Sequence, residues 1–311
     1  MDIFLFILMN NVAPIFLLIV VGYILGKKFK LDIRSLVKIN FYMFVPALIF
    51  SKIYETQIEM DLLKAFLFGV ILLILNFLSS TLVSKLRGYS TSLESAFKNS
   101  VMFYNSGNFG LPLISLVFKD SPAMTYAISI QIMILLVQNL STNTLGFYNA
   151  GRSHMKLKDT ILAILKMPVV YAISCAFLLK AIPYDFTQTF VWPAVSYVRD
   201  GLISVALLTL GVQLSVTKLN FRNKDAYLAS FMRLLGGPLM AYLLILLFRV
   251  DGAMAQVLMI SSAVPTAVNS ALIAVEFDNE PDFASQVVLT TTLLSAVTVT
   301  GVIYLAKHIF A

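Results

Sequence analysis

Residues 104–112 read YNSGNFGLP and residues 261–270 read SSAVPTAVNS, and each stretch lies inside a long apolar run. Pro112 and Pro265 each lack a backbone donor and crowd the preceding turn, while Gly110 tolerates unwound backbone. We therefore expect a helix to break in both stretches. Backbone freed inside a bilayer persists only where it lines a cavity or is buried in protein, so two such breaks indicate a binding site. The alternative is a pair of proline kinks with no ligand.

The composition is that of a membrane protein. Of the 311 residues, 59% are hydrophobic and 13% are charged, and the mean hydropathy is +0.87. A soluble domain has about 25% charged residues, so a soluble enzyme is excluded. The single cysteine, Cys175, excludes an internal disulfide and a cysteine-based zinc or iron–sulfur centre. The two histidines, His154 and His308, lie in a basic connector and near the C-terminus, so we expect neither a metal nor a cofactor.

Apolar runs long enough to cross about 30 Å of hydrocarbon occur ten times. They lie near residues 3–25, 35–53, 62–84, 95–118, 122–149, 160–182, 188–216, 225–248, 253–275 and 283–307. Fifteen Lys and Arg residues lie on alternate connectors and six on the opposite set. The positive-inside bias makes the first set cytoplasmic and places both termini outside the cell membrane. Because the basic residues follow the connectors, the net charge of +7 does not indicate nucleic-acid binding.

The spacing of prolines indicates an internal duplication. Pro14 and Pro168 lie in the first and sixth spans, 154 residues apart, and Pro112 and Pro265 lie in the fourth and ninth, 153 apart. Five spans is an odd number, so a second copy enters the membrane inverted. The predicted fold is an all-α membrane protein of ten transmembrane helices in two inverted five-helix repeats, with broken crossing helices 4 and 9. The predicted repeats are residues 1–155 and 156–311.

The polar residues of the two interrupted stretches predict the chemistry of the site. Neither stretch contains Asp, Glu, Lys or Arg, which disfavours a cation/proton antiporter, because such a carrier normally needs a buried carboxylate. Two half-helix N-termini facing one cavity present N–H groups and positive dipole ends, which favours a small anion such as a carboxylate. The predicted binding residues are Asn105, Ser106, Asn108, Gln138, Thr266 and Asn269, with Gly110, Pro112 and Pro265 at the crossover.

Two features of other spans have more than one interpretation. Gln131, Gln138 and Thr142 share one face of the fifth span, where they either line the cavity or hydrogen-bond to neighbouring helices. Arg233 lies one or two turns inside the eighth span. Its side chain is expected to snorkel to the cytoplasmic interface, with pairing to a carboxylate or attraction of an anion as the alternatives.

Short motifs are spread along the whole chain. They are Val12-Ala13-Pro14, residues 44–50 (FVPALIF), residues 105–112 (NSGNFGLP), residues 206–214 (ALLTLGVQL), Arg233-Leu234 with Pro238, and Pro265 followed by Glu276-Phe277 and Pro281-Asp282. In order and spacing these motifs resemble those of the auxin efflux carrier family. Its members include plant auxin exporters and bacterial permeases for malate or malonate.

The resemblance implies a fold similar to that of bile-acid sodium symporters, with Pro112 and Pro265 at the helix crossover. It implies that Asn105 holds a substrate carboxylate. It also implies a scaffold of spans 1, 2, 6 and 7, often a homodimer surface, and a moving transport unit of spans 3–5 and 8–10. The chain lacks the long loop that plant exporters carry between spans 5 and 6, so it looks like the short bacterial permeases.

The resulting hypothesis is a secondary active transporter of small carboxylate anions in the cell membrane, working by alternating access. Coupling to H⁺ or Na⁺ is open, as are the exact substrate and the direction of transport. One alternative is a channel or a non-transporting membrane scaffold, and another is a sodium-coupled organic-anion symporter of the bile-acid type. We do not expect an enzyme, because the spans hold no cluster of His, Cys or carboxylates at mid-depth.

Overall fold

The computed structural model describes residues 3–55, 60–151, 168–216 and 223–310, and these are helical throughout apart from short connections and one isolated β-bridge. The α-helices are α1 (Ile3–Ile7), α2 (Ala13–Phe29), α3 (Ile33–Ile39), α4 (Val45–Glu55), α5 (Met60–Leu86), α6 (Thr91–Met102), α7 (Leu111–Val117), α8 (Met124–Ser141), α9 (Phe147–Ala150), α11 (Pro168–Lys180), α12 (Val191–Val216), α13 (Lys224–Phe231), α14 (Gly237–Phe248), α15 (Gly252–Ser262), α16 (Val268–Glu276) and α17 (Pro281–Ile309). The π-helical turns are η1 (Leu8–Val12), η2 (Asn40–Phe44), η3 (Ser106–Gly110), η4 (Thr142–Gly146) and η6 (Met232–Gly236), and η5 (Phe186–Gln188) is a 3₁₀ turn.

Seven helical segments in the described part of the chain are long and apolar enough to cross a membrane. They are Phe4–Phe29, Ser35–Glu55, Asp61–Leu86, Met124–Ala150, Val191–Val216, Lys224–Phe248 and Pro281–Ile309. This confirms the predicted all-helical membrane class. Two further predicted spans, 95–118 and 253–275, are each divided into two short helices. The predicted span 160–182 begins outside the described residues, and its described part is α11.

The π-helical turns explain how the chain stays helical through four of its prolines. Four of the five end two residues before a proline, namely Pro14, Pro46, Pro112 and Pro238. In an α-helix the proline ring would clash with the carbonyl four residues earlier. The wider π turn bonds each N–H to the carbonyl five residues back, as Gly237 N–H does to Met232 O, and so makes room for the ring. These prolines therefore do not end the helical segments that contain them.

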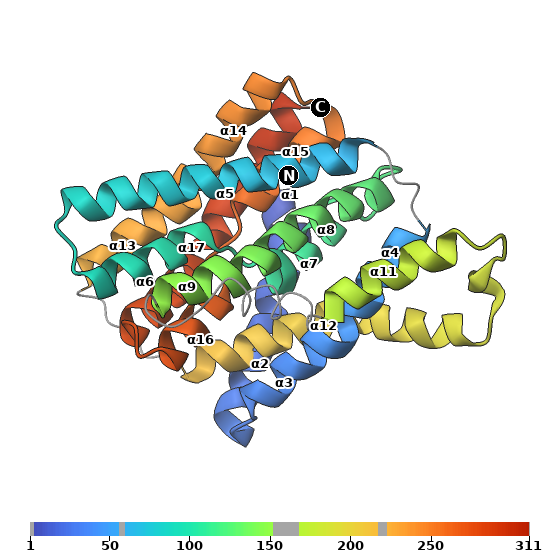
Figure 1. Cartoon of the computed structure of the whole chain (residues 1–311), viewed down its shortest axis with the longest axis horizontal. Coiled ribbons are helices and arrows are strands. Elements are labelled where there is room, and N and C mark those ends of the chain that lie inside the picture. Colours follow the sequence, from blue (N-terminus) through green and yellow to red (C-terminus); the bar gives the residue numbers. More distant parts are fainter. Residues whose placement is uncertain (1–2, 56–59, 152–167, 217–222, 311) are drawn as a thin grey trace.

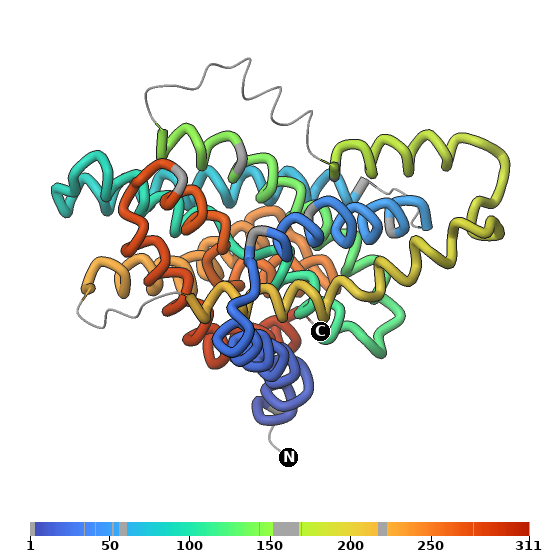
Figure 2. The backbone as a smooth tube through the Cα atoms, turned by 90° about the horizontal axis from the view of Figure 1, so that it is seen from below, coloured from blue at the N-terminus to red at the C-terminus, as the bar shows by residue number. Residues whose placement is uncertain are grey.

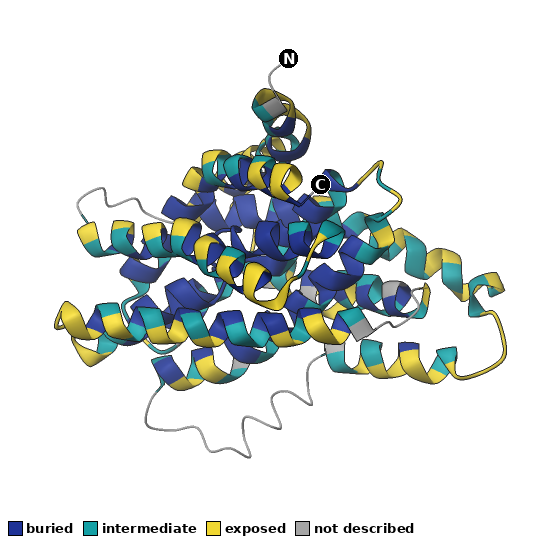
Figure 3. Cartoon of the chain, turned by 90° about the horizontal axis from the view of Figure 1, so that it is seen from above, coloured by how far each residue is buried: buried dark blue, intermediate teal, exposed yellow. Residues whose placement is uncertain are grey.

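The helices pack in two groups around a buried centre. In one, α2 packs along α12, and α4 packs against both α11 and α12 (Figures 1 and 2). In the other, α5 packs on α6 and α8, α15 packs on α8, α14 and α17, and α13 packs on α17. Buried residues gather toward the middle of the molecule (Figure 3). Large apolar side chains such as Leu17, Leu82 and Val297 are exposed. Such an apolar exterior is expected of a surface that faces lipid.

Glycine allows α2 and α12 to pack at close range. A Cβ atom on Gly211 would lie 2.0 Å from the Ile19 carbonyl oxygen, and one on Gly22 would lie 2.3 Å from the Leu208 carbonyl oxygen. Both neighbours are backbone atoms, which cannot move aside as a flexible side chain can. The two helices must therefore separate if either glycine gains a side chain.

We predict that Gly211→Ala lowers the free energy of unfolding by about 1–3 kcal/mol, because overpacking forces α2 and α12 apart. Thermal unfolding of the purified protein in detergent measures the change. Gly301→Ala in α17 is the matched control, since open space surrounds its Cβ position and Ala favours a helix over Gly by up to about 1 kcal/mol. Equal midpoints for the two variants would contradict the close approach.

Candidate functional site

The two divided helices meet where their backbone is unwound. The first interruption, residues 103–105, lies between α6 and η3, and the second, residues 263–267, lies between α15 and α16. An isolated antiparallel bridge joins Tyr104 to Thr266. Asn105 N–H donates to the Pro265 carbonyl at 2.8 Å, and Ala267 N–H donates to the Phe103 carbonyl at 2.9 Å. Each interruption thus supplies backbone partners to the other.

Side chains from unbroken helices satisfy further backbone groups of the crossover. Tyr104 N–H donates to Gln138 Oε1 at 3.0 Å, and the Gln131 amide donates to the Ser106 carbonyl at 2.9 Å, both glutamines coming from α8. Thr266 N–H donates to Thr291 Oγ1 of α17 at 3.1 Å. Gln131 and Gln138 therefore hydrogen-bond to the interrupted helix, and Gln138 also lines the cavity described below. These bonds replace the water that a bilayer lacks.

The proline positions differ from the prediction in one respect. Pro265 lies within the second interruption, but Pro112 lies in the first turn of α7, after the π turn, so the helix breaks at residues 103–105 and not at Pro112. The two prolines consequently do not occupy equivalent places. Gly110 lies at the end of η3, where a Cβ atom would come within 2.6 Å of Gln131 Nε2. Glycine there leaves the space that the Gln131 amide needs.

A small polar cavity of about 30 Å³ lies at the crossover. Its lining residues are Val45, Tyr104, Asn105, Ser106, Gly107, Asn108, Leu135, Gln138, Asn139, Thr142, Ala267, Val268 and Asn269. Five of the six predicted binding residues are among them. They come from η3 and the residue before it, from α8 and from α16, which brings together segments far apart in the sequence. Both half-helix N-termini border this cavity.

Thr266 is the predicted binding residue that does not line the cavity. It is fully buried at the crossover, where its hydroxyl donates to the Ser100 carbonyl at 2.8 Å. Its backbone N–H is occupied by Thr291. In this structure Thr266 therefore ties the end of α6 to the second interruption.

Two amide side chains of the cavity have nitrogen atoms without partners. Asn105 Oδ1 accepts from the Asn108 backbone N–H at 3.1 Å, and Gln138 Oε1 accepts from Tyr104 N–H. A backbone N–H can only donate, so these contacts fix which end of each amide is oxygen. Among the described residues, Asn105 Nδ2 and Gln138 Nε2 are buried and make no hydrogen bond of normal geometry. The cavity therefore presents unused donors, each of which is costly to leave unpaired.

The cavity contains no ionisable group apart from the Tyr104 phenol, and within the described residues no cluster of three His, Cys, Asp or Glu side chains could hold a metal. A charged residue does lie behind it. Arg233 in η6 is 0% exposed, and its guanidinium carbon is 4.6 Å from the centre of the Tyr104 ring. The expectation that Arg233 snorkels to the interface is wrong. In the sequence, the one indication that Arg233 is buried is that it lies alone within an apolar stretch.

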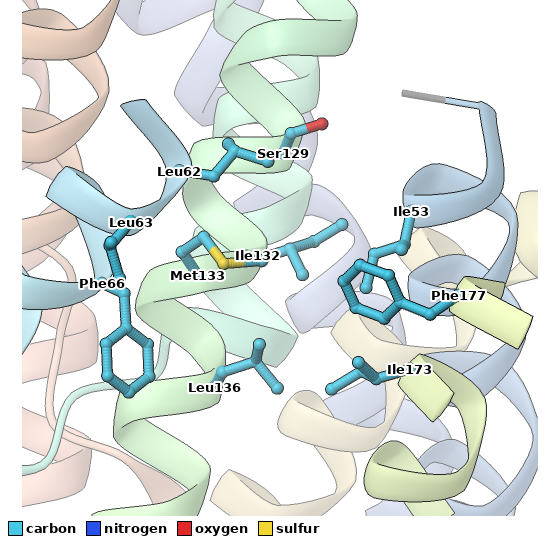
Figure 4. Close-up of a pocket in the computed structure, with 10 residues that line it drawn as sticks. All are labelled: Ile53, Leu62, Leu63, Phe66, Ser129, Ile132, Met133, Leu136, Ile173 and Phe177. Atoms are coloured by element: carbon cyan, nitrogen blue, oxygen red, sulfur yellow. The ribbon is translucent and has the colours of Figure 1, made fainter. Parts of the chain in front are cut away.

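A larger cavity of about 240 Å³ lies between α4, α5, α8 and α11 (Figure 4). It is lined by Ile53, Leu62, Leu63, Phe66, Ser129, Ile132, Met133, Leu136, Ile173 and Phe177. Nine of these side chains are apolar, so the cavity offers almost nothing to orient a polar ligand. The smaller crossover cavity is the better candidate for a specific site.

The model of the membrane transport protein family matches residues 7–154 and 152–303. The chain belongs to this family. The family that the sequence motifs indicated is thereby confirmed. The chain is also similar to a protein of Methanothermobacter thermautotrophicus named as an uncharacterized transporter, with 24% identity over 93% of this chain and 95% of the relative. An uncharacterized transporter of Methanocaldococcus jannaschii is 22% identical over 91% of this chain and 94% of its own length. The protein is a membrane transporter.

We predict that Thr266→Val lowers the free energy of unfolding by about 1–2 kcal/mol, because the buried Ser100 carbonyl loses its donor. Thermal unfolding in detergent measures the change. Thr298→Val is the matched control, since Thr298 is half-buried on α17 and its hydroxyl donates to the Leu294 carbonyl of its own helix. Its effect should stay within about 0.5 kcal/mol. An unchanged unfolding midpoint for Thr266→Val would show that the hydroxyl does not secure the crossover.

Proposed function

We propose that the protein is a secondary active transporter of small carboxylate anions across the cell membrane, with its substrate site at the helix crossover. The observation that carries this proposal is the pair of buried, unpartnered amide nitrogens of Asn105 and Gln138, which border one cavity. Membership of the membrane transport protein family supports transport as such. The amides supply the chemistry of the substrate.

The unused groups favour an anion over a cation. A cation needs converging oxygen atoms. Here the side-chain oxygens of Asn105 and Gln138 each already accept from a backbone donor, whereas their nitrogens have no partner among the described residues. A carboxylate only accepts hydrogen bonds, so it matches such donors. The N-terminus of α16, which has no side-chain cap, adds backbone N–H groups beside Asn269.

Helix contacts support the inverted repeat. If spans 1–5 correspond to spans 6–10, then α2, α4, α5, α6 and α8 correspond in that order to α11, α12, α13, α15 and α17. The repeat then requires three pairs of equivalent contacts: α2 on α12 with α11 on α4, α5 on α8 with α13 on α17, and α8 on α15 with α17 on α6. All six contacts are present. The two stretches matched by the family model, 7–154 and 152–303, also divide the chain near the proposed boundary after residue 155.

The same contacts support a division into two units. On this proposal, spans 1, 2, 6 and 7 form the scaffold, and spans 3–5 and 8–10 form the transport unit that carries the crossover. The proposed topology has ten spans with both termini outside the cell, and the distribution of basic residues over the connectors supports it. The cavity of about 30 Å³ has room for roughly one water molecule, so admission of a carboxylate substrate needs the site to open. Alternating access supplies that opening.

We predict that Asn105→Asp reduces transport more than about tenfold, because it exchanges an unpaired donor for an anionic oxygen and keeps the acceptor for Asn108 N–H. Asn105→Ala should also abolish transport, with folding nearly intact. The measurement is saturable uptake and counterflow of radiolabelled malate or malonate in proteoliposomes.

The control is Asn10→Ala, because Asn10 is exposed and bonds only the Phe6 carbonyl of its own helical segment, at 2.9 Å. Its uptake should stay within about twofold of the native protein. Native uptake by Asn105→Asp would refute the site. Absence of saturable counterflow in the native protein with either acid would instead refute the carrier.

A further inference from the structure

Arg233 links the C-terminal ends of both interrupted helices. Its Nη1 donates to the Val101 carbonyl at 3.0 Å in the last turn of α6, and its Nη2 donates to the carbonyl of Ser262, the last residue of α15. Its guanidinium lies over the Tyr104 ring, and Tyr104 lines the cavity. The arginine thus lies one side chain behind the proposed substrate site.

The local sequence holds the guanidinium in this place. Arg233 belongs to the π turn η6, which ends two residues before Pro238. A Cβ atom on Gly237 would lie 2.3 Å from Arg233 Nη2, so glycine leaves the space that the guanidinium fills. Among the described residues no carboxylate forms an ion pair with Arg233. Its charge is therefore offset only by carbonyl dipoles and by the face of an aromatic ring.

Four helix ends meet at the crossover, and their charges nearly cancel. The C-terminal ends of α6 and α15 each carry a dipole equivalent to about −0.5 charge, and the N-terminal ends of Ser106–Val117 and α16 each carry about +0.5. Helix dipoles alone therefore leave the crossover close to neutral. The full positive charge of Arg233 then makes the region net positive.

We propose that Arg233 is a positioning residue that sets the preference of the crossover site for anions, while Asn105 and Gln138 supply the direct hydrogen bonds. This inference rests on the function proposed above. The arginine neutralises the two helix C-termini, which would otherwise repel an anion, and leaves the two N-termini to attract it. It does so through Tyr104 and the backbone, without touching the ligand.

The test compares a carboxylate with a neutral ligand of the same skeleton. Malonate and malonamide are titrated into the purified protein, and the ratio of their dissociation constants is obtained from thermal shifts. Arg233→Gln removes the charge and keeps a neutral amide donor at the position. It should lower the malonate preference about tenfold or more and leave malonamide binding within about threefold. Arg233→Lys keeps the charge and should keep the ratio within about threefold.

Ser230→Ala is the structural control. It removes a buried neutral hydrogen bond, from the Ser230 hydroxyl to the Ala226 carbonyl, about one turn before Arg233, so it should leave the ratio unchanged. If Arg233→Gln does not fold, Gly237→Ala replaces it, because the added methyl group displaces the guanidinium without removing the charge from the chain. The ratio should fall in that variant too.

An unchanged ratio in Arg233→Gln, or in Gly237→Ala where that variant replaces it, overturns the inference. So does an equal fall in Arg233→Lys and Arg233→Gln, since geometry and not charge would then be responsible. If Arg233→Gln leaves the ratio of the two dissociation constants unchanged while Asn105→Asp abolishes malonate binding, the inference fails and the proposed function stands. If the native protein prefers no carboxylate over its neutral analogue, both fail.

Discussion

The crossover is governed by the need to satisfy backbone hydrogen-bonding groups where there is no water. Unwinding α6 from η3 and α15 from α16 frees N–H and carbonyl groups whose exposure to hydrocarbon costs several kcal/mol each. The two interruptions satisfy some of these groups mutually, through the pairs Asn105 to Pro265 and Ala267 to Phe103. Others bond to side chains of α8, α17 and η6. Unbroken helices must therefore lie at fixed depths beside the broken ones, and this requirement sets the packing of the centre.

The prolines of the sequence indicated where helices are irregular, but in one span the interruption lies several residues before the proline. They correctly indicated which spans are irregular, yet Pro112 is accommodated by the π turn η3, and the helix breaks before that turn. The helix α6 ends at Met102, and the next helical segment begins after Asn105, whose side chain caps it by accepting from Asn108 N–H and whose own N–H donates to the second interruption. That partner is distant in the sequence. Local spacing could therefore predict the irregular region but not the residue at which the helix ends.

The polar residues of the site could be predicted from the sequence, but the hydrogen-bond partner of each one could not. Asparagines and glutamines in apolar spans indicated buried hydrogen bonding, and five of the six chosen residues border one cavity. Thr266 is also a polar residue within an apolar span, but its hydroxyl donates to the Ser100 carbonyl, because the end of α6 lies beside it. Arg233 could not be placed, since its burial depends on α6, α15 and η6 meeting at one point. Residue type predicts which groups need partners, and only the tertiary structure identifies them.

Neutral amides and a buried charge do different things for a ligand. Amide groups such as Asn105 Nδ2 donate to any oxygen of suitable geometry, including that of water, so they orient a ligand without selecting for charge. A guanidinium behind an aromatic ring selects for charge without imposing geometry, because Coulomb energy falls slowly with distance in a medium of low polarity. On the proposed function, the empty site carries both unpaired donors and unbalanced positive charge. A bound carboxylate relieves both together, so the loaded site is better suited than the empty one to move through the membrane.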